Sequence, residues 1–220
     1  MKIFNILILI SIIPLVGVML LILIPGRYNS YCFNAALFIS SLTFILSLIM
    51  WLIFDSGHNS FQFLCTIDWL PAFNFYYTVG VDGISLFFLI LTTFLIMVCV
   101  LISWGSINYR LKEYLINFLL LEFLLIQVFS VLDLLLFYVF FESILMPMFL
   151  IIGIWGSRER KIRAAYQFFL YTLVGSVLML LGILIIYSHG GTTDLNVMKL
   201  GVFWKKTDIF MSIFLFKFCC

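Results

Sequence analysis

Long apolar runs separated by short polar segments fill most of the chain. At a rise of ~1.5 Å per residue, a helix of about twenty residues crosses the ~30 Å hydrocarbon core of a bilayer. Six such spans are predicted, at about residues 3–24, 32–54, 84–104, 114–131, 132–154 and 164–187. A seventh apolar run, at about 209–220, is too short to cross a bilayer alone.

The composition agrees with this pattern, since 65% of the residues are hydrophobic and 10% are charged. No segment between the runs is long enough for a soluble domain of useful size. The first run is too long for a signal peptide and lacks a small-residue cleavage site, so we expect it to be the first span. Residues 1–220 are therefore predicted to form a single transmembrane domain of an all-α, polytopic membrane protein.

The Lys and Arg positions predict the orientation. The loops after odd-numbered spans carry seven basic residues, namely Arg27, Arg110, Lys112, Arg158, Arg160, Lys161 and Arg163. The opposite side carries Lys2, Lys199, Lys205 and Lys206. Basic loops stay on the cytoplasmic or matrix side of a membrane, so the N-terminus is predicted to lie outside.

The connections between spans offer helix caps and interface anchors. The longest connection, residues 55–81, is polar and aromatic and is predicted to be an interfacial loop, because Trp and Tyr favour headgroup depth. Asp82 precedes the third span and is expected to be its N-cap, with a catalytic Asp as the alternative. Asp133, at the turn between the fourth and fifth spans, is also expected to be a cap.

Glu142 is a lone carboxylate near the middle of the fifth predicted span. A charge at that depth is costly, and such residues usually face a bundle interior or a wet path where they pair or carry ions. Pro147 removes the backbone N–H that would bond the carbonyl of Ser143, which leaves polar backbone close to the carboxylate. Glu142 is therefore a candidate for proton translocation, and the alternative is a protonated acid that hydrogen-bonds a neighbouring helix.

Glu122 is a second mid-span carboxylate, on the fourth predicted span, with Gln127 one and a half turns further on. Two adjacent spans that each carry a mid-depth carboxylate are unusual, and one could pass protons to the other through water. The competing interpretation is structural pairing of Glu122 with another residue.

Other site chemistries find little support in the sequence. The five cysteines (Cys32, Cys65, Cys99, Cys219 and Cys220) lack paired metal spacing and are predicted to be reduced thiols, with a disulfide or metal site as the alternative. The two histidines, His58 and His189, lie in predicted loops, which argues against a haem or a quinone held by an intramembrane His. There is no dinucleotide or Walker motif and no basic stripe for nucleic acid, so we expect no cofactor, no metal and no nucleic acid.

Two segments closely resemble the subunit 4 family of respiratory complex I, the proton-pumping NADH:ubiquinone oxidoreductase. They are VGVDGISLFFLILTTFLI at residues 79–96 and LDLLLFYVFFESILMPMFLIIGIWGSRERKIRAAYQFFLYTLVGSVLMLLGILI at residues 132–185. The form is that of plant, algal or protist mitochondria, with a bacterial counterpart as the next candidate. The resemblance covers residues from about 61 to 185, and the first sixty residues fit by hydropathy only.

The resemblance implies the N-terminal half of an antiporter-like membrane-arm subunit of about fourteen spans, in the mitochondrial inner membrane with its N-terminus towards the intermembrane space. It implies no redox cofactor, contacts with lipid and other membrane-arm subunits, and coupling of distant quinone reduction to proton translocation. Glu142 corresponds to a fifth-span Glu that pairs with a seventh-span Lys in the family, and Glu122 to a fourth-span acid. Lys217 falls about five residues short of the expected Lys, so a second chain carrying the C-terminal half is expected to supply it.

Two other functions remain open from the sequence. The chain could be a structural fragment of the membrane arm that pumps nothing, as the missing seventh-span Lys would suggest. It could also belong to a related cation/proton antiporter or membrane-bound hydrogenase, which share the fold.

Overall fold

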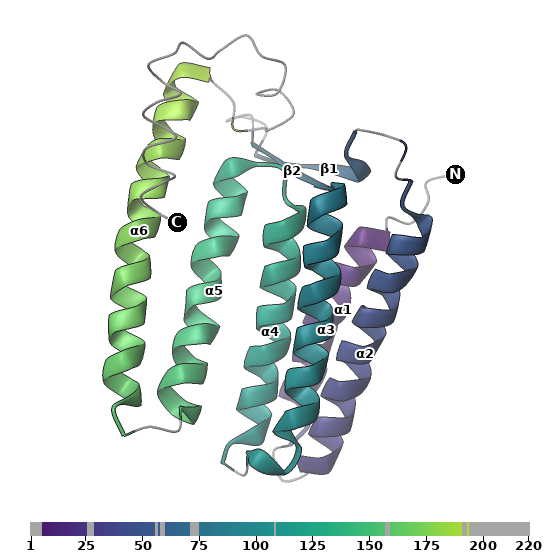
Figure 1. The fold of residues 1–220 in the computed structure, drawn as a ribbon, viewed down its shortest axis with the longest axis vertical. Helices are drawn as coiled ribbons and strands as arrows, with labels where there is room; N and C mark the ends of the chain where they lie inside the picture. The colour runs from purple at the N-terminus through teal and green to yellow at the C-terminus, as the bar shows by residue number, and fades with distance from the viewer. Residues whose placement is uncertain are drawn as a thin grey trace.

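The computed structural model of the protein describes residues 6–25, 29–55, 57, 60–70, 75–107, 109–156, 159–190 and 193. Long helices run alternately up and down in chain order (Figure 1). Along the sequence, a β-hairpin connects the second helix to the third. The helices are α1 (Ile6–Leu23), α2 (Asn29–Ile53), α3 (Gly83–Ser106), α4 (Leu111–Ser130), α5 (Leu134–Trp155) and α6 (Lys161–Gly190). The strands are β1 (Gln62–Leu70) and β2 (Phe75–Val81).

All six helices are long and apolar enough to cross a membrane, which confirms the prediction of a polytopic helical fold. Their ends lie within a few residues of the predicted ends. The predicted seventh run at 209–220, including Lys217, lies outside the described residues.

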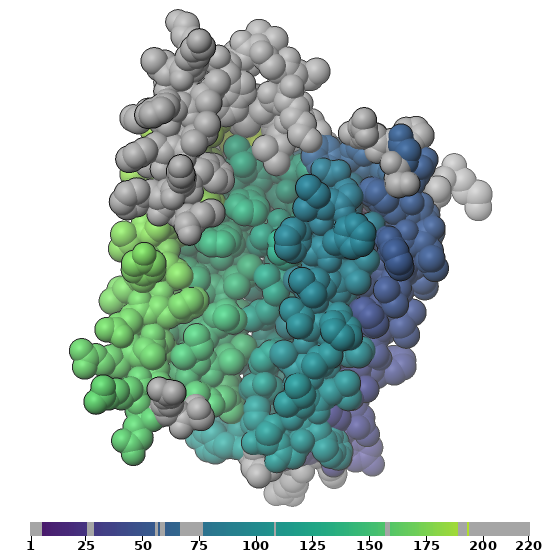
Figure 2. Space-filling model, in the orientation of Figure 1, coloured from purple at the N-terminus to yellow at the C-terminus, as the bar shows by residue number. Residues whose placement is uncertain are grey.

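The helices form a packed group with an open edge. α1 packs against α2 and α4, and α3 packs between α2 and α4. α5 packs against α4 on one side and α6 on the other, so that α6 stands at the outer edge of the molecule (Figures 1 and 2). In the most apolar window of α5 only 17% of residues are buried, compared with 44% in α4. α4 is therefore the central helix, whereas α5 and α6 have few fully buried residues.

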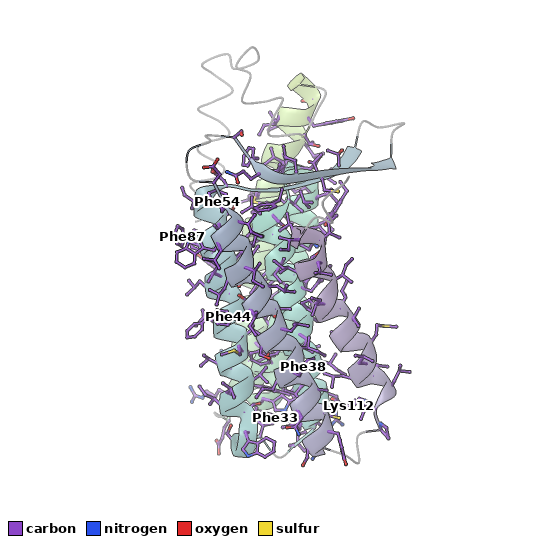
Figure 3. All side chains as sticks on the ribbon, turned by 90° about the vertical axis from the view of Figure 1, so that its right-hand side faces the viewer. Phe33, Phe38, Phe44, Phe54, Phe87 and Lys112 are labelled. Atoms are coloured by element: carbon purple, nitrogen blue, oxygen red, sulfur yellow. The ribbon has the colours of Figure 1, made fainter. Side chains whose placement is uncertain are left out.

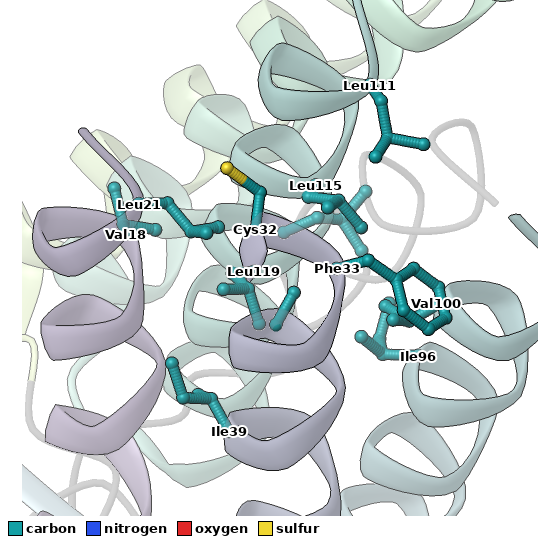
Figure 4. Close-up of a cluster of buried hydrophobic side chains, with 12 residues drawn as sticks. Val18, Leu21, Cys32, Phe33, Ile39, Ile96, Val100, Leu111, Leu115 and Leu119 are labelled. Atoms are coloured by element: carbon teal, nitrogen blue, oxygen red, sulfur yellow. The ribbon is translucent and has the colours of Figure 1, made fainter. Parts of the chain in front are cut away.

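Two clusters of buried apolar side chains hold the helices together. One lies between α1, α2, α3 and α4 at the end away from the hairpin (Figure 4). The other lies beneath the hairpin and contains Leu7, Ile10, Met50, Val79, Val81, Leu86, Leu89, Ile126, Val131 and Leu136. Lipid is as apolar as these side chains, so the clusters stabilise the bundle through close packing more than through removal from water.

The predicted interfacial loop at 55–81 forms an antiparallel β-hairpin across one end of the bundle (Figures 1 and 3). Two irregularities interrupt the register, between Gln62 and Cys65 and between Asp68 and Leu70. Each irregularity shifts the alternation of side chains between the two faces, so the segment carries no regular period of two. The backbone N–H of Leu132 donates to the carbonyl of Thr78 at 2.9 Å, which ties β2 to the start of α5.

Basic side chains stabilise helix ends at the opposite end of the bundle from the hairpin, where Figure 3 shows Lys112. The Lys112 ammonium donates to the carbonyls of Ile22 at 3.0 Å and Ile24 at 2.7 Å, at the end of α1. The Lys161 ammonium donates to the carbonyl of Ile154 at 2.6 Å, at the end of α5. A cation is favourable there because carbonyl groups at a helix C-terminus are unpaired and carry partial negative charge.

Candidate functional site

Glu122 is fully buried in the middle of the bundle, with no solvent-exposed surface. Its Oε1 atom lies 2.5 Å from the Thr43 hydroxyl on α2. Its Oε2 atom is also buried and has no hydrogen-bond partner among the described residues. A buried carboxyl group that is only half satisfied is costly, so Oε2 marks a place where water or a further polar group belongs.

Buried hydroxyl groups line the face of α2 that Glu122 contacts. Ser40, Thr43 and Ser47 have no exposed surface and lie three and four residues apart, which places them on one helix face. The Ser47 hydroxyl lies 3.1 Å from that of Thr93 on α3. These hydroxyls and Glu122 form a polar strip between α2, α3 and α4 within an otherwise apolar interior.

Glu142 is half-buried on α5. Its Oε2 atom is buried and, like that of Glu122, has no hydrogen-bond partner in the described part of the chain. The neighbouring Ser143 hydroxyl donates to the carbonyl of Val139 at 2.7 Å and so is directed along its own helix. Pro147 is also buried, and α5 continues across it.

The structure places Glu122 and Glu142 on two helices that pack against each other. No hydrogen bond joins their carboxyl groups, and within the described ranges neither forms an ion pair. Glu122 has a hydrogen-bonding partner at Oε1, and each of the two acids has a buried Oε2 atom without a partner among the described residues.

Both predicted aspartate caps are confirmed. Asp82 accepts from the N–H of Gly83 at 2.7 Å and forms a capping box with Ser85 at the start of α3. Asp133 accepts through Oδ1 from two backbone N–H groups in the first turn of α5. Its Oδ2 atom accepts from the Thr193 hydroxyl at 2.7 Å, which ties Thr193 to the start of α5. These aspartates thus position helices.

Gln127, one and a half turns beyond Glu122 on α4, has its partner outside the helices. It is bound by the hairpin, because the Tyr77 hydroxyl donates to Gln127 Oε1 at 2.5 Å. Burial raises the pKa of Tyr77 above its usual value of 10.0. The Tyr77 hydroxyl consequently stays neutral and links the hairpin to the central helix.

The cysteines and other metal-binding residue types do not form a second site in the part of the chain that the structure describes. Cys32 is buried, Cys65 and Cys99 are half-buried, and all three are free thiols. No three His, Cys, Asp or Glu side chains gather there in a way that could hold a metal ion. The predicted thiols Cys219 and Cys220 lie outside the described residues.

The hydroxyl groups of Ser40, Thr43 and Ser47 were missed by the sequence reasoning, although a signal was present. Three hydroxyl residues at helical spacing in an apolar helix indicate a polar face. That spacing alone does not identify Glu122 as the partner, because Ser and Thr in helices usually bond their own backbone carbonyls.

Comparisons with known proteins find relatives of this chain. Residues 131–219 match the family described as NADH:quinone oxidoreductase/Mrp antiporter, TM. A protein of Chondrus crispus named NADH-ubiquinone oxidoreductase chain 4 is 61% identical over 98% of this chain and 44% of its own length. The chain is a homologue of part of NADH-ubiquinone oxidoreductase chain 4. The resemblance seen in the sequence motifs is thereby confirmed, and the multi-pass membrane fold with it.

Further chain 4 relatives agree. The proteins of that name from Arabidopsis thaliana and Prototheca wickerhamii are 52% and 53% identical, over 92% and 87% of this chain. They are matched over 41% and 39% of their own lengths. In a structure of respiratory complex I from Thermus thermophilus with bound NADH, one chain superposes with a TM-score of 0.80 at 28% identity. That match covers 97% of this chain and 43% of the other.

The extent of the matches refines two points. The chain spans less than half the length of the curated chain 4 relatives it matches. The match to the Chondrus crispus protein covers 216 residues, so the likeness extends through the first sixty residues, where the motifs alone gave only hydropathy. The matched family segment includes Glu142 and begins after Glu122.

Proposed function

We propose that this chain is the N-terminal half of a proton-translocating membrane-arm subunit of respiratory complex I. In this role it couples NADH:ubiquinone oxidoreduction, carried out elsewhere in the complex, to proton movement across the mitochondrial inner membrane. The observation that carries the proposal is the buried Glu122 beside a helix bearing Glu142, in a chain 4 homologue. Each acid retains a buried oxygen atom without a partner in the described residues.

The proposed roles follow from carboxyl chemistry. Moving a cation towards or away from a carboxyl group in an apolar medium changes how tightly that group holds its proton. Glu142 lies on α5, which also packs against the outer helix α6, and is proposed to be the acid that responds to such a cation. Glu122, enclosed between α2 and α4, exchanges protons with it through water. Both residues act in proton transfer, and the chain itself carries out no redox step.

A second polypeptide is proposed to complete the subunit and supply the cation. The chain 4 relatives are more than twice as long as the matched region, so a complete subunit needs further helices. The uncovered surfaces of α5 and α6 offer the place for them: Tyr171, Val174 and Leu170 on α6 are 85%, 62% and 59% exposed. A Lys on the partner that approaches Glu142 would offset the cost of holding a carboxylate in the membrane.

The proposed orientation places the hairpin and the N-terminus in the intermembrane space and the basic end in the matrix. Arg110, Lys112 and Lys161 lie at the end of the bundle opposite the hairpin, which supports it. The test is protease access in mitoplasts compared with inverted inner-membrane vesicles. Cleavage at the basic segment 158–163 only in inverted vesicles is expected, and cleavage there in mitoplasts would overturn the orientation.

The function is tested by Glu142→Gln in the assembled complex, which keeps shape and hydrogen bonding but removes ionisation. We expect normal amounts of assembled complex and a severe loss of coupled quinone reduction and proton pumping. Glu142→Asp retains the charge with a shorter reach and should lose less activity. Glu113→Gln is the matched control, because Glu113 is an exposed residue paired with Arg110.

A purely structural role is the second candidate, favoured by the absence of a cation beside Glu142 within the described part of the chain. A subunit that only holds the membrane arm together needs its helices to be folded, but it does not need Glu122 and Glu142 to ionise. Normal coupled turnover in an assembled Glu142→Gln complex would therefore refute the pumping role and support the structural role.

A further inference from the structure

The Thr43 hydroxyl lies between two oxygen atoms, and this position limits where protons can be. Its Oγ1 atom is 2.8 Å from the backbone carbonyl oxygen of Ser40 and 2.5 Å from Glu122 Oε1. A hydroxyl group has one hydrogen to donate and can also accept. Thr43 can therefore donate to only one of these oxygen atoms at a time.

The two directions of donation correspond to the two charge states of Glu122. When Thr43 donates to the Ser40 carbonyl, the short contact to Glu122 requires that the acid carry the proton and donate it to Thr43. When Glu122 is ionised, Thr43 must turn its hydrogen towards the carboxylate. The Ser40 carbonyl then keeps only the backbone hydrogen bond that it accepts within helix α2. Both arrangements leave Oε1 satisfied in a site without solvent exposure.

We propose that Thr43 is a positioning residue for Glu122, whose hydroxyl hydrogen turns between the Ser40 carbonyl and the Glu122 carboxylate as the acid gains and loses its proton. On ionisation the O–H bond of Glu122 breaks, the proton passes to a water molecule of the path, and the electron pair stays on the carboxylate. On reprotonation these steps reverse. The inference rests on the proposed proton-translocating function and adds a residue on a helix that carries no acid.

The surroundings leave Thr43 as the main group that can respond to the charge on Glu122. α1 has no titratable side chain in its described range. Among the side chains that the structure describes, the other titratable groups on segments packed against α4 are Tyr31 and Cys32 on α2, Tyr77 on β2, Cys99 on α3, and Tyr138 and Glu142 on α5. None of them is a hydrogen-bond partner of Glu122.

Loss of the Thr43 hydroxyl should favour the protonated acid. A hydrogen bond to an ionised group is about twice as strong as one between neutral groups. Removal of the hydroxyl therefore costs the carboxylate more than the neutral acid. We expect the proton affinity of Glu122 to rise about tenfold and proton pumping near neutral pH to fall by a similar factor.

The test uses the purified complex containing this chain, reconstituted in liposomes. Infrared difference spectroscopy identifies the Glu122 carboxyl band as the one lost in Glu122→Gln. Thr43→Val should move that band towards the position of a free carboxylic acid and slow proton pumping about tenfold. Thr43→Ser should restore both. Thr92→Val is the matched control, because the Thr92 hydroxyl bonds the Leu89 carbonyl and not an acid.

The outcomes separate this inference from the function on which it rests. If Glu122→Gln pumps normally, the proposed role of Glu122 is wrong. If Glu122→Gln loses pumping but Thr43→Val leaves both the band and the pumping rate unchanged, the role of Thr43 is wrong. If Thr43→Val does not assemble, the unmodified complex still decides: a Glu122 band at the position of a free acid overturns the inference, and one at that of a hydrogen-bonded acid supports it.

Discussion

Gly17 is a position where α1 lies close against side chains of its neighbours α2 and α4. A Cβ atom built there would lie 2.9 Å from two carbon atoms of the Ile39 side chain and 3.1 Å from a methyl carbon of Leu119. Gly17→Val adds that atom and two more carbons to a filled interface. Overpacking of this kind costs about 1–3 kcal/mol. We therefore expect α1 to separate from α2 and α4 more readily in the variant.

The reactivity of Cys32 measures this separation of α1. Cys32 is fully buried in the apolar cluster that also contains Ile39 and Leu119 (Figure 4). A membrane-permeant thiol reagent reacts with it only when the cluster opens, so labelling measures the opening equilibrium. A cost of about 1–3 kcal/mol corresponds to labelling about 5–150-fold faster in Gly17→Val. The extent of labelling at this cysteine is read by mass spectrometry of its peptide.

Gly153→Ala is the matched control, since a Cβ atom there would meet its nearest neighbour, the Ala165 Cβ, at an ordinary 3.8 Å. We expect its Cys32 labelling to match that of the unmodified chain. Equal labelling in Gly17→Val and the unmodified chain would refute the close packing of α1 described above.

Three further changes test other contacts. Asp133→Ala removes the N-cap of α5 and should lower stability by about 1 kcal/mol in thermal unfolding of the subunit, whereas Asp133→Asn should retain most of it. Lys112→Met removes the cation at the end of α1 and should speed labelling of Cys32 a few-fold, with Lys112→Arg close to the unmodified chain. Because burial raises the pKa of Tyr77, its contribution to stability should be complete below pH 10.0 and lost as the pH rises further. Tyr77→Phe should remove that loss, as measured by stability at increasing pH.

The spans could be predicted because they depend on a property of single residues. A run of about twenty apolar residues has few alternatives to a membrane-crossing helix, since each backbone polar group must bond within its segment. Asp82 and Asp133 could be assigned as caps for a similar reason, because a cap depends on the next three residues. Glu122 and Glu142 stood out because an acid in an apolar run is costly wherever its neighbours lie.

The features that the sequence did not reveal depend on distant residues. Thr43 and Glu122 are separated by 79 positions, and only the packing of α2 on α4 brings them together. The hairpin was missed because its two register irregularities disrupt the alternation by which a strand is recognised. Gln127 and its partner Tyr77 are separated by 50 positions, and only the packing of the hairpin on α4 brings them together.

The most direct test of the central claim is a structure of the intact complex that resolves the surroundings of Glu142. The claim is that this chain forms half of a proton path whose cation lies on another polypeptide. The account predicts a second chain packed along α5 and α6, with a Lys ammonium within about 4 Å of the Glu142 carboxyl group in one functional state. An α5 that faces open lipid at Glu142, with no cation from any other chain nearby, would contradict it.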